Sequence, residues 1–221
     1  MAISAFLVAE SVAAEQRCLT APEPGTDWSQ CNKSNIVLRG GDLEGANLTG
    51  ANFNATDLRE ANLNSANLQG AALVRASLAG ASAQKADFAK VEGYRSNFAG
   101  VSAEGASFAG AELQRSDFSE ARLNGTLFEK AELGRANFDK AVLSGVRFTL
   151  ANLARADLSG ATFDGPIDFG KAFMFLTRIE GLDLSAASGL EQAQIDIACG
   201  DDETKLPPGL AKPASWPCSF D

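Results

Sequence analysis

Gly41-Asp42-Leu43-Glu44-Gly45-Ala46-Asn47-Leu48-Thr49-Gly50 contains two copies of a five-residue unit that recurs, almost unbroken, from about Trp28 to Leu184. Each unit has a small residue, then Asp or Asn, then Leu or Phe, then two polar or glycine positions. A period of five matches neither the 3.6 residues of a helical turn nor the alternation of an ordinary strand. Self-similarity at a fixed short period is typical of a repeat architecture and argues against an enzyme.

The pattern within each pentad predicts a short extended stretch followed by a corner. The small residue lies two positions before the Leu or Phe, here called the centre, so both side chains point inward and the Asp or Asn between them points outward. The two positions after the centre are rich in turn-forming residues. Corners of about 90° close the chain after roughly four pentads, which predicts a coil of about 20 residues stacked at the ~4.8 Å strand spacing.

Two columns of charged residues support the 20-residue coil independently. Three glutamates are spaced by 20: Glu92, Glu112 and Glu132. Five of the eleven arginines share the last position of their pentads and are also spaced by 20: Arg75, Arg95, Arg115, Arg135 and Arg155. A period of five alone would not select one position in every twenty.

Core volumes agree with this coil. Large centres lie on two opposite sides, one reading Leu38, Leu58, Leu78, Phe98, Phe118, Phe138, Leu158 and the other Leu48, Leu68, Phe88, Phe108, Phe128, Phe148. Phe is thus expected to face Phe across the interior of the middle coils. The remaining two sides shrink there to Ala83, Gly93 and Ala103, while Val91 and Val101 partly refill the space, as close packing requires.

The pattern resembles the pentapeptide-repeat family, whose members fold as right-handed quadrilateral parallel β-helices. The resemblance covers about residues 26–186 and implies an all-β solenoid of about seven to eight coils, a rod about 35–40 Å long. The first pentads are imperfect, and the beat slips by one residue at Gly165-Pro166 before it resumes. Residues 36–186 are therefore predicted to be the β-helix.

A solenoid needs caps over its open ends. Residues 15–35 are expected to form an N-terminal cap with the first imperfect repeats, and residues 187–221 a C-terminal cap. In the latter, Ser188-Gly189-Leu190-Glu191 matches a capping box, which predicts a helix over about 189–199 that Gly200 ends, followed by a Pro-rich tail. Phe173 and Phe175 occupy outward positions and call for a cover, either the tail or a partner in a homodimer formed through the C-terminal end.

The four cysteines lie only in the end segments. Because a rod some 35 Å long separates the two pairs, only Cys18–Cys31 and Cys199–Cys218 are within disulfide reach. The alternative is four free, buried thiols. A zinc site made of all four would require the two ends of the rod to meet, so no metal is expected.

The N-terminus favours export. Residues 1–14 are mostly apolar and small, and Val12-Ala13-Ala14 before Glu15 resembles a signal-peptidase site. These residues are either the remnant of a signal peptide or a short N-terminal helix. Together with the paired cysteines they predict an oxidising extracytoplasmic compartment, the bacterial periplasm or a plastid lumen, with the cytoplasm as the alternative. No segment is long and apolar enough to span a membrane.

Catalytic chemistry has little support. The chain has no histidine, which removes His-based triads and His metal sites. The acidic residues fall in outward slots that the repeat explains, and no glycine-rich loop leads into a helix that could cradle phosphate. No catalytic residue and no cofactor is predicted.

Two functions compete. The leading hypothesis is a non-catalytic structural or binding rod whose flat faces bind a protein or an anionic polymer. The alternative comes from the family resemblance and from the net charge of −9: an acidic mimic of DNA that binds gyrase, a type II topoisomerase, in the manner of quinolone-resistance pentapeptide proteins. The negative charge argues against direct binding of nucleic acid.

The arginine column itself has two interpretations. It could grip a partner that carries carboxylates or phosphates. It could also be an ion ladder, in which each arginine pairs with the glutamate of its own pentad or with a nearby aspartate, chosen from Asp57, Asp117 and Asp157. We expect the ladder, with each exposed pair contributing little stability.

Overall fold

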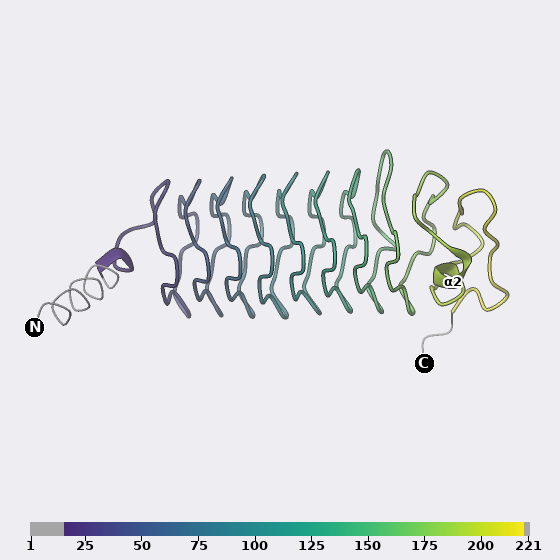
Figure 1. The fold of residues 1–221 in the computed structure, drawn as a ribbon, viewed down its shortest axis with the longest axis horizontal. Coiled ribbons are helices and arrows are strands. Elements are labelled where there is room, and N and C mark those ends of the chain that lie inside the picture. Colours follow the sequence, from purple (N-terminus) through teal and green to yellow (C-terminus); the bar gives the residue numbers. More distant parts are fainter. Residues whose placement is uncertain (1–15, 219–221) are drawn as a thin grey trace, which may run out of the picture.

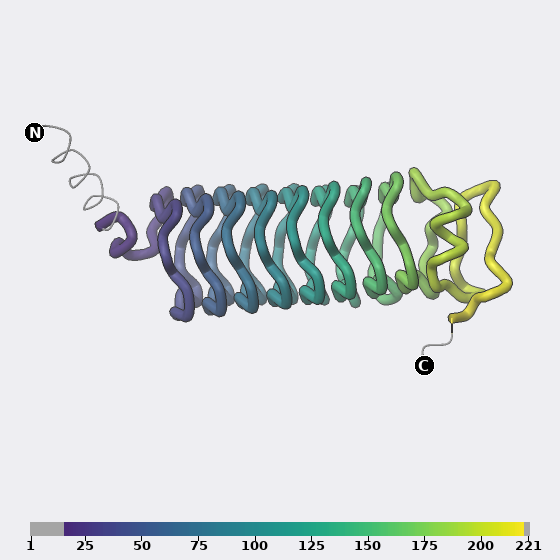
Figure 2. The backbone as a smooth tube through the Cα atoms, turned by 60° about the horizontal axis from the view of Figure 1, so that its bottom comes forward, coloured from purple at the N-terminus to yellow at the C-terminus, as the bar shows by residue number. Residues whose placement is uncertain are grey.

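The computed structural model describes residues 16–218, and these form a straight rod of stacked coils (Figure 1). The fold is the right-handed β-helix that the repeat predicts. The coils advance steadily along the sequence from one end of the rod to the other, and the C-terminal residues close the far end (Figure 2). Residues 1–14, for which a signal peptide or a helix was expected, lie outside the described residues.

Parallel bridges between successive coils set the register. They join residues 20 apart from Asp27–Asn47 to Val142–Thr162. The bridges that span Gly165, such as Arg147–Asp168, join residues 21 apart, so the predicted one-residue slip is confirmed. Eight successive bridges lead from Asp27 to Ser188, a stack about 38 Å long at the ordinary strand spacing.

Each pentad makes two kinds of backbone hydrogen bond. The centre bonds to the next coil, as when the Phe98 N–H donates to the Asp117 carbonyl at 2.7 Å. The corner closes as a turn, in which the Val101 N–H donates to the Phe98 carbonyl at 3.0 Å. The last corner residue has positive φ, 65° at Gly100, a conformation that costs glycine nothing and other residues some strain. Glycine recurs at corners for this reason.

The core is a column of buried small and large side chains, with the phenylalanines in two facing stacks. Within a stack the rings lie parallel, with centroids 4.6 Å apart for Phe88–Phe108 and 4.8 Å for Phe98–Phe118. Across the interior the rings meet edge to face, at 5.5 Å for Phe98–Phe108. Both arrangements are favourable for aromatic pairs, and the prediction that Phe faces Phe is confirmed.

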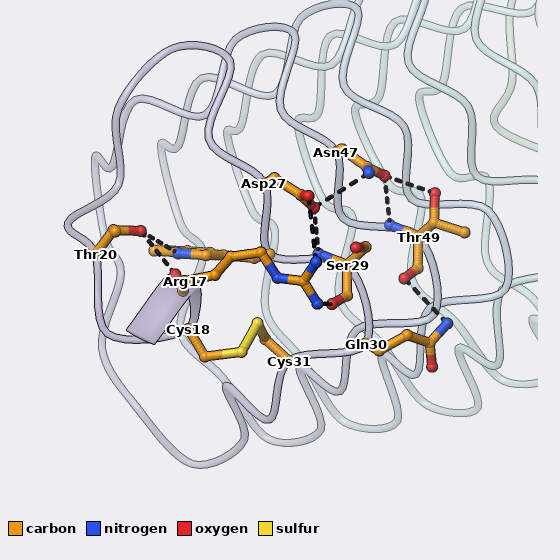
Figure 3. The surroundings of a disulfide bond; sticks show 10 residues. Arg17, Cys18, Thr20, Asp27, Ser29, Gln30, Cys31, Asn47 and Thr49 are labelled. Carbon is orange, nitrogen blue, oxygen red and sulfur yellow. Dashed lines mark hydrogen bonds and ion pairs between the residues drawn. A yellow bond between two sulfur atoms is a disulfide. The ribbon is translucent and has the colours of Figure 1, made fainter. Parts of the chain in front are cut away.

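The N-terminal end is closed by side chains and a disulfide. Cys18 is bonded to Cys31, with the Cα atoms 5.5 Å apart. Arg17 donates to the Ser29 carbonyl at 2.8 Å and lies 3.4 Å from the carboxylate of Asp27 (Figure 3). The indole N–H of Trp28 donates to Thr20 at 2.9 Å. These contacts fasten the segment before the repeats to the first coil.

The first coil also contains a lysine at a centre position. Lys33 is only 7% exposed, and its ammonium nitrogen lies 3.5 Å from the centroid of the Trp28 ring. Burial lowers the pKa of Lys33, because the charged form loses water. The ring face offsets part of that loss.

The C-terminal helix differs from its prediction. Helix α2 spans only Gln192–Ile195, and its capping box is formed by Glu191 and Gln194 instead of Ser188 and Glu191. The prediction of 189–199 was wrong because both ends of that range belong to coils. Ser188 bridges Asp168, and Cys199 bridges Arg178. The chain between them has room for a single turn.

The Pro-rich tail covers the end of the rod. Cys218 is bonded to Cys199, with 5.5 Å between the Cα atoms, and the Trp216 indole donates to the Ala198 carbonyl at 2.7 Å. The tail does not cover Phe173 and Phe175, which remain 51% and 43% exposed. The expectation that it would do so was wrong, because its anchors hold it over the rod end instead of the lateral face.

Gly93 tests the packing of the middle coils. A Cβ atom at this position would approach the Leu113 side chain to 2.8 Å and Ser96 Oγ to 3.1 Å. We therefore expect Gly93→Leu to overpack the core and to lower the free energy of unfolding by about 1–3 kcal/mol in urea denaturation. Gly134→Ala is the control, since its Cβ atom would make only ordinary contacts, the nearest at 3.6 Å. Equal stability of Gly93→Leu and the wild type would contradict this packing.

Candidate functional site

The five arginines of the column lie at one corner of the rod. They end the pentads 71–75, 91–95, 111–115, 131–135 and 151–155, and all are exposed. We call this side of the rod, from residue 71 to the pentad 172–176, the arginine face. Every arginine of the column has a positive φ, between 57° and 60°.

Those φ values make the arginines a costly choice for the fold. Positive φ costs a non-glycine residue on the order of 1–3 kcal/mol. The other three corners use glycine repeatedly at this position, for example Gly100, Gly105 and Gly110. The arginine corner has no glycine in five successive coils. The backbone conformation therefore does not explain the arginine column, and other long side chains occupy the same position at other corners, as at Lys90 and Glu120.

Ion pairs do not explain it either. Within residues 16–218, none of the five arginines forms a salt bridge. The rod does form ion pairs elsewhere, as between Arg122 and Glu104 at 3.1 Å and between Arg147 and Glu129. In both pairs the arginine occupies a bridge position in the middle of a face and reaches a glutamate on the preceding coil.

The predicted ion ladder is therefore wrong. Glu92, Glu112 and Glu132 occupy bridge positions, whereas the arginine of the same pentad ends the turn and has a positive φ. None of these glutamates forms a salt bridge with the arginine of its own pentad within residues 16–218. Asp57 and Asp157 are engaged elsewhere, by Arg59 at 2.6 Å and by Arg178 at 2.8 Å, and Asp117 accepts a hydrogen bond from Asn137.

Unpaired stacking has an electrostatic cost. Neighbouring arginines of the column are one coil apart, about 4.8 Å along the backbone, and two like charges at 4 Å repel by about 1 kcal/mol in water. A partial compensation is the stacking of Arg95 on Tyr94, at 5.2 Å from the ring centroid. A row of unpaired guanidinium groups is suited to binding carboxylate or phosphate groups.

Three parallel columns make up the arginine face. The glutamate column runs through bridge positions, with Glu92 and Glu112 exposed and Glu132 half-buried. Between it and the arginine column lies a column without charges: Val74, Tyr94, Gln114, Gly134 and Ala154. On each of the other three faces, the corresponding position of the pentad carries a charge in at least one coil, as at Arg59, Glu104 and Glu129.

The C-terminal end of the arginine face is apolar. Phe173 and Phe175 take the next places in the glutamate and uncharged columns, and their rings stack at 6.3 Å. Leu176 follows Arg155 in the arginine column, and its N–H donates to the Ile197 carbonyl at 2.7 Å. Sequence reasoning missed this continuation, although counting the one-residue slip would have aligned these residues.

Carboxylates outside the arginine face are held by local contacts. The hydrogen bond from Arg59 lowers the pKa of Asp57 to about 2, and the hydrogen bond from Lys205 lowers the pKa of Asp183 to about 2. Neither carboxylate has the raised pKa expected of a general acid. Residues 16–218 contain no cluster of three or more His, Cys, Asp or Glu suited to a metal ion. Among the helices described, none has the length and apolarity needed to cross a membrane.

The comparisons with known proteins agree with the fold. The family model for pentapeptide repeats matches residues 25–54, 56–91, 94–130 and 131–165 in eight copies. No curated protein matches the chain. A trypsin-treated variant of QnrB1, a plasmid-mediated fluoroquinolone resistance protein, is similar with a TM-score of 0.64 and 17% identity, over 84% of this chain and 91% of that one. At this identity the likeness concerns the fold alone.

Two further solved structures have lower TM-scores. HetL, a pentapeptide repeat protein involved in heterocyst differentiation regulation in the cyanobacterium Nostoc sp. strain PCC 7120, is 25% identical over 88% of this chain and 97% of that one, with a TM-score of 0.43. A pentapeptide repeat protein of the Arabidopsis thaliana thylakoid lumen is 29% identical over 60% of this chain and 79% of that one, with a TM-score of 0.31.

Replacing one arginine of the column tests whether it supports the fold. We expect Arg115→Gly to raise the free energy of unfolding by up to about 1 kcal/mol, since glycine relieves the positive φ and one like charge leaves the stack. Arg122→Gly is the control and should be destabilising, because it loses the pair with Glu104. Both are measured by urea denaturation in dilute solution. A clear loss of stability in Arg115→Gly would restore the ion-ladder interpretation.

Proposed function

This chain belongs to the pentapeptide-repeat family, and we propose that it is a non-catalytic binding rod that works outside the cytoplasm. Its flat faces present columns of side chains to a protein or polymer partner. The observation that carries the proposal is the arginine column: five exposed guanidinium groups, aligned on successive coils and without ion pairs among residues 16–218. The arginine face is the binding surface.

Export is supported by the caps. All four cysteines form disulfides, Cys18–Cys31 and Cys199–Cys218. Each fastens a terminal segment to the end of the rod and closes a short loop, the arrangement expected of a protein that matures in an oxidising compartment. Short loops of this size contribute about 3 kcal/mol each in the chain-entropy model. The disulfides thus stabilise the caps only where thiols are oxidised, as in a periplasm or a plastid lumen.

The alternative is the DNA mimic that binds gyrase. It is favoured by the net charge of −9 and by a fold similar to that of QnrB1, a plasmid-mediated fluoroquinolone resistance protein. A mimic of DNA needs a continuous acidic surface that a basic groove can hold. The arginine column interrupts the acidic surface along five coils of one corner, which weighs against this function.

Thiol titration of the denatured, unreduced protein separates the two. The proposal predicts no reactive thiol in protein isolated from its native compartment, and four after reduction. The control is the same titration on Cys199→Ser, which should expose one thiol, that of Cys218. Four free thiols in the untreated wild type would contradict export and favour the cytoplasmic alternative. A gyrase supercoiling assay would then be the decisive next measurement.

A further inference from the structure

We infer that the arginine face binds a second copy of the same chain, side by side and parallel, so that the arginine column of each copy lies against the glutamate column of the other. This inference rests on the proposed role of the arginine face as a binding surface and names its occupant. It follows from the spacing, the order and the charges of the three columns.

Spacing selects another solenoid as the partner. Arginines and glutamates both repeat once per coil, at about 4.8 Å, which is the spacing of stacked strands. A strand laid along the rod would repeat its side chains at about 6.6–6.8 Å and would fall out of register after a few residues. A second β-helix repeats at the same spacing and stays in register over the whole column.

The order of the columns selects a parallel arrangement. Across the arginine face the columns run glutamate, uncharged, arginine. A two-fold axis parallel to the rod and lying along the uncharged column exchanges the outer two columns and keeps each coil at its own level. Arg95 of one copy then meets Glu92 of the other, and the coils of Arg115 and Arg135 repeat this contact. With both directions counted, three levels supply six intermolecular ion pairs. An antiparallel pair would place arginine against arginine.

The residues on the axis fit this contact. Val74, Tyr94, Gln114, Gly134 and Ala154 carry no charge, so each can lie against its own copy without repulsion. At the C-terminal end the same axis brings the exposed Phe175 against its counterpart and places Phe173 near Leu176 of the other copy. The apolar end that the tail leaves exposed is thereby covered. Exposed apolar patches of this kind mark interaction surfaces.

The size of the arginine face determines the strength of the contact. From Arg75 to Phe175 it is about 25 Å long, and the three residue steps from the glutamate column to the arginine column make it about 10 Å wide. The area of the arginine face is therefore well below the roughly 800 Å² that each partner buries in a stable complex. The dimer is therefore weak and reversible, and it depends on its ion pairs and on salt. A cross-link that captures the associated form is the appropriate measurement.

Ala154→Cys provides that cross-link. Ala154 lies on the axis and away from the central coil, so its cysteine meets its own copy only in the parallel arrangement. Ala99→Cys is the matched control: both alanines are half-buried, follow the centre of their pentad, and donate their N–H to an asparagine two residues before, at 3.1 and 2.8 Å. We expect Ala154→Cys to form covalent dimer roughly tenfold faster on oxidation, because the associated pair raises the effective thiol concentration.

Salt and charge reversal identify the ion pairs. Cross-linking of Ala154→Cys should fall to the rate of the control at about 1 M salt, where the Debye length is about 3 Å. Glu92→Arg, Glu112→Arg and Glu132→Arg combined should abolish it, as should Arg95→Glu, Arg115→Glu and Arg135→Glu combined. A mixture of the two triple variants should cross-link again, since at the three reversed levels one face is then positive and the other negative. Circular dichroism and melting curves check that each variant folds.

Equal cross-linking of Ala154→Cys and Ala99→Cys, at low salt and high protein concentration, would overturn the inference. So would cross-linking that the charge reversals leave unchanged. The proposed function fails by a different measurement, the appearance of four free thiols in the untreated protein. If the thiols are absent and Ala154→Cys does not cross-link, the exported rod stands and the dimer does not.

Discussion

The parallel hydrogen bonds between successive coils are the interaction on which the rest of this structure depends. Before the slip, each centre donates to the carbonyl of a residue 19 positions later, as Phe98 does to Asp117, and the following coil returns the bond, as when Asp117 donates to the Ser96 carbonyl at 3.0 Å. These bonds satisfy the backbone in a molecule whose one fully described helix, α2, has four residues, and whose coils within residues 16–218 are joined by isolated bridges in place of long strands. They also fix which side chains stack.

The same register makes both the core and the surface columnar. In the interior it stacks phenylalanine on phenylalanine, and the volume that two sides gain is removed from the other two at Ala83, Gly93 and Ala103. On the surface it stacks arginine on arginine. A core column is favourable in itself, because apolar groups gain from contact. A column of like charges is unfavourable in itself, so it requires a counter-charge from a neighbouring coil or from another molecule.

Much of this could be predicted from the sequence, because the repeat determines backbone and core together. The 20-residue coil, the facing phenylalanines and the slip at Gly165-Pro166 all follow from position within the pentad. The ion ladder could not be judged that way, since closeness in sequence does not establish that two charged side chains lie within ion-pair distance. The helix near Gln192 was overestimated for a related reason: its flanks, Ser188 and Cys199, are claimed by bridges to coils that local capping signals do not reveal.

The most direct test concerns the register itself, because every column depends on it. Ala79 and Ala99 are 20 residues apart and should have Cα atoms about 4.8 Å apart, within the range that a disulfide requires. The double variant Ala79→Cys/Ala99→Cys is therefore expected to form an intramolecular disulfide on oxidation. The variant Ala79→Cys/Ala89→Cys, in which the sites are closer in sequence but on opposite faces, should keep both thiols free. A bond in the second variant and none in the first would contradict the coil and every column derived from it.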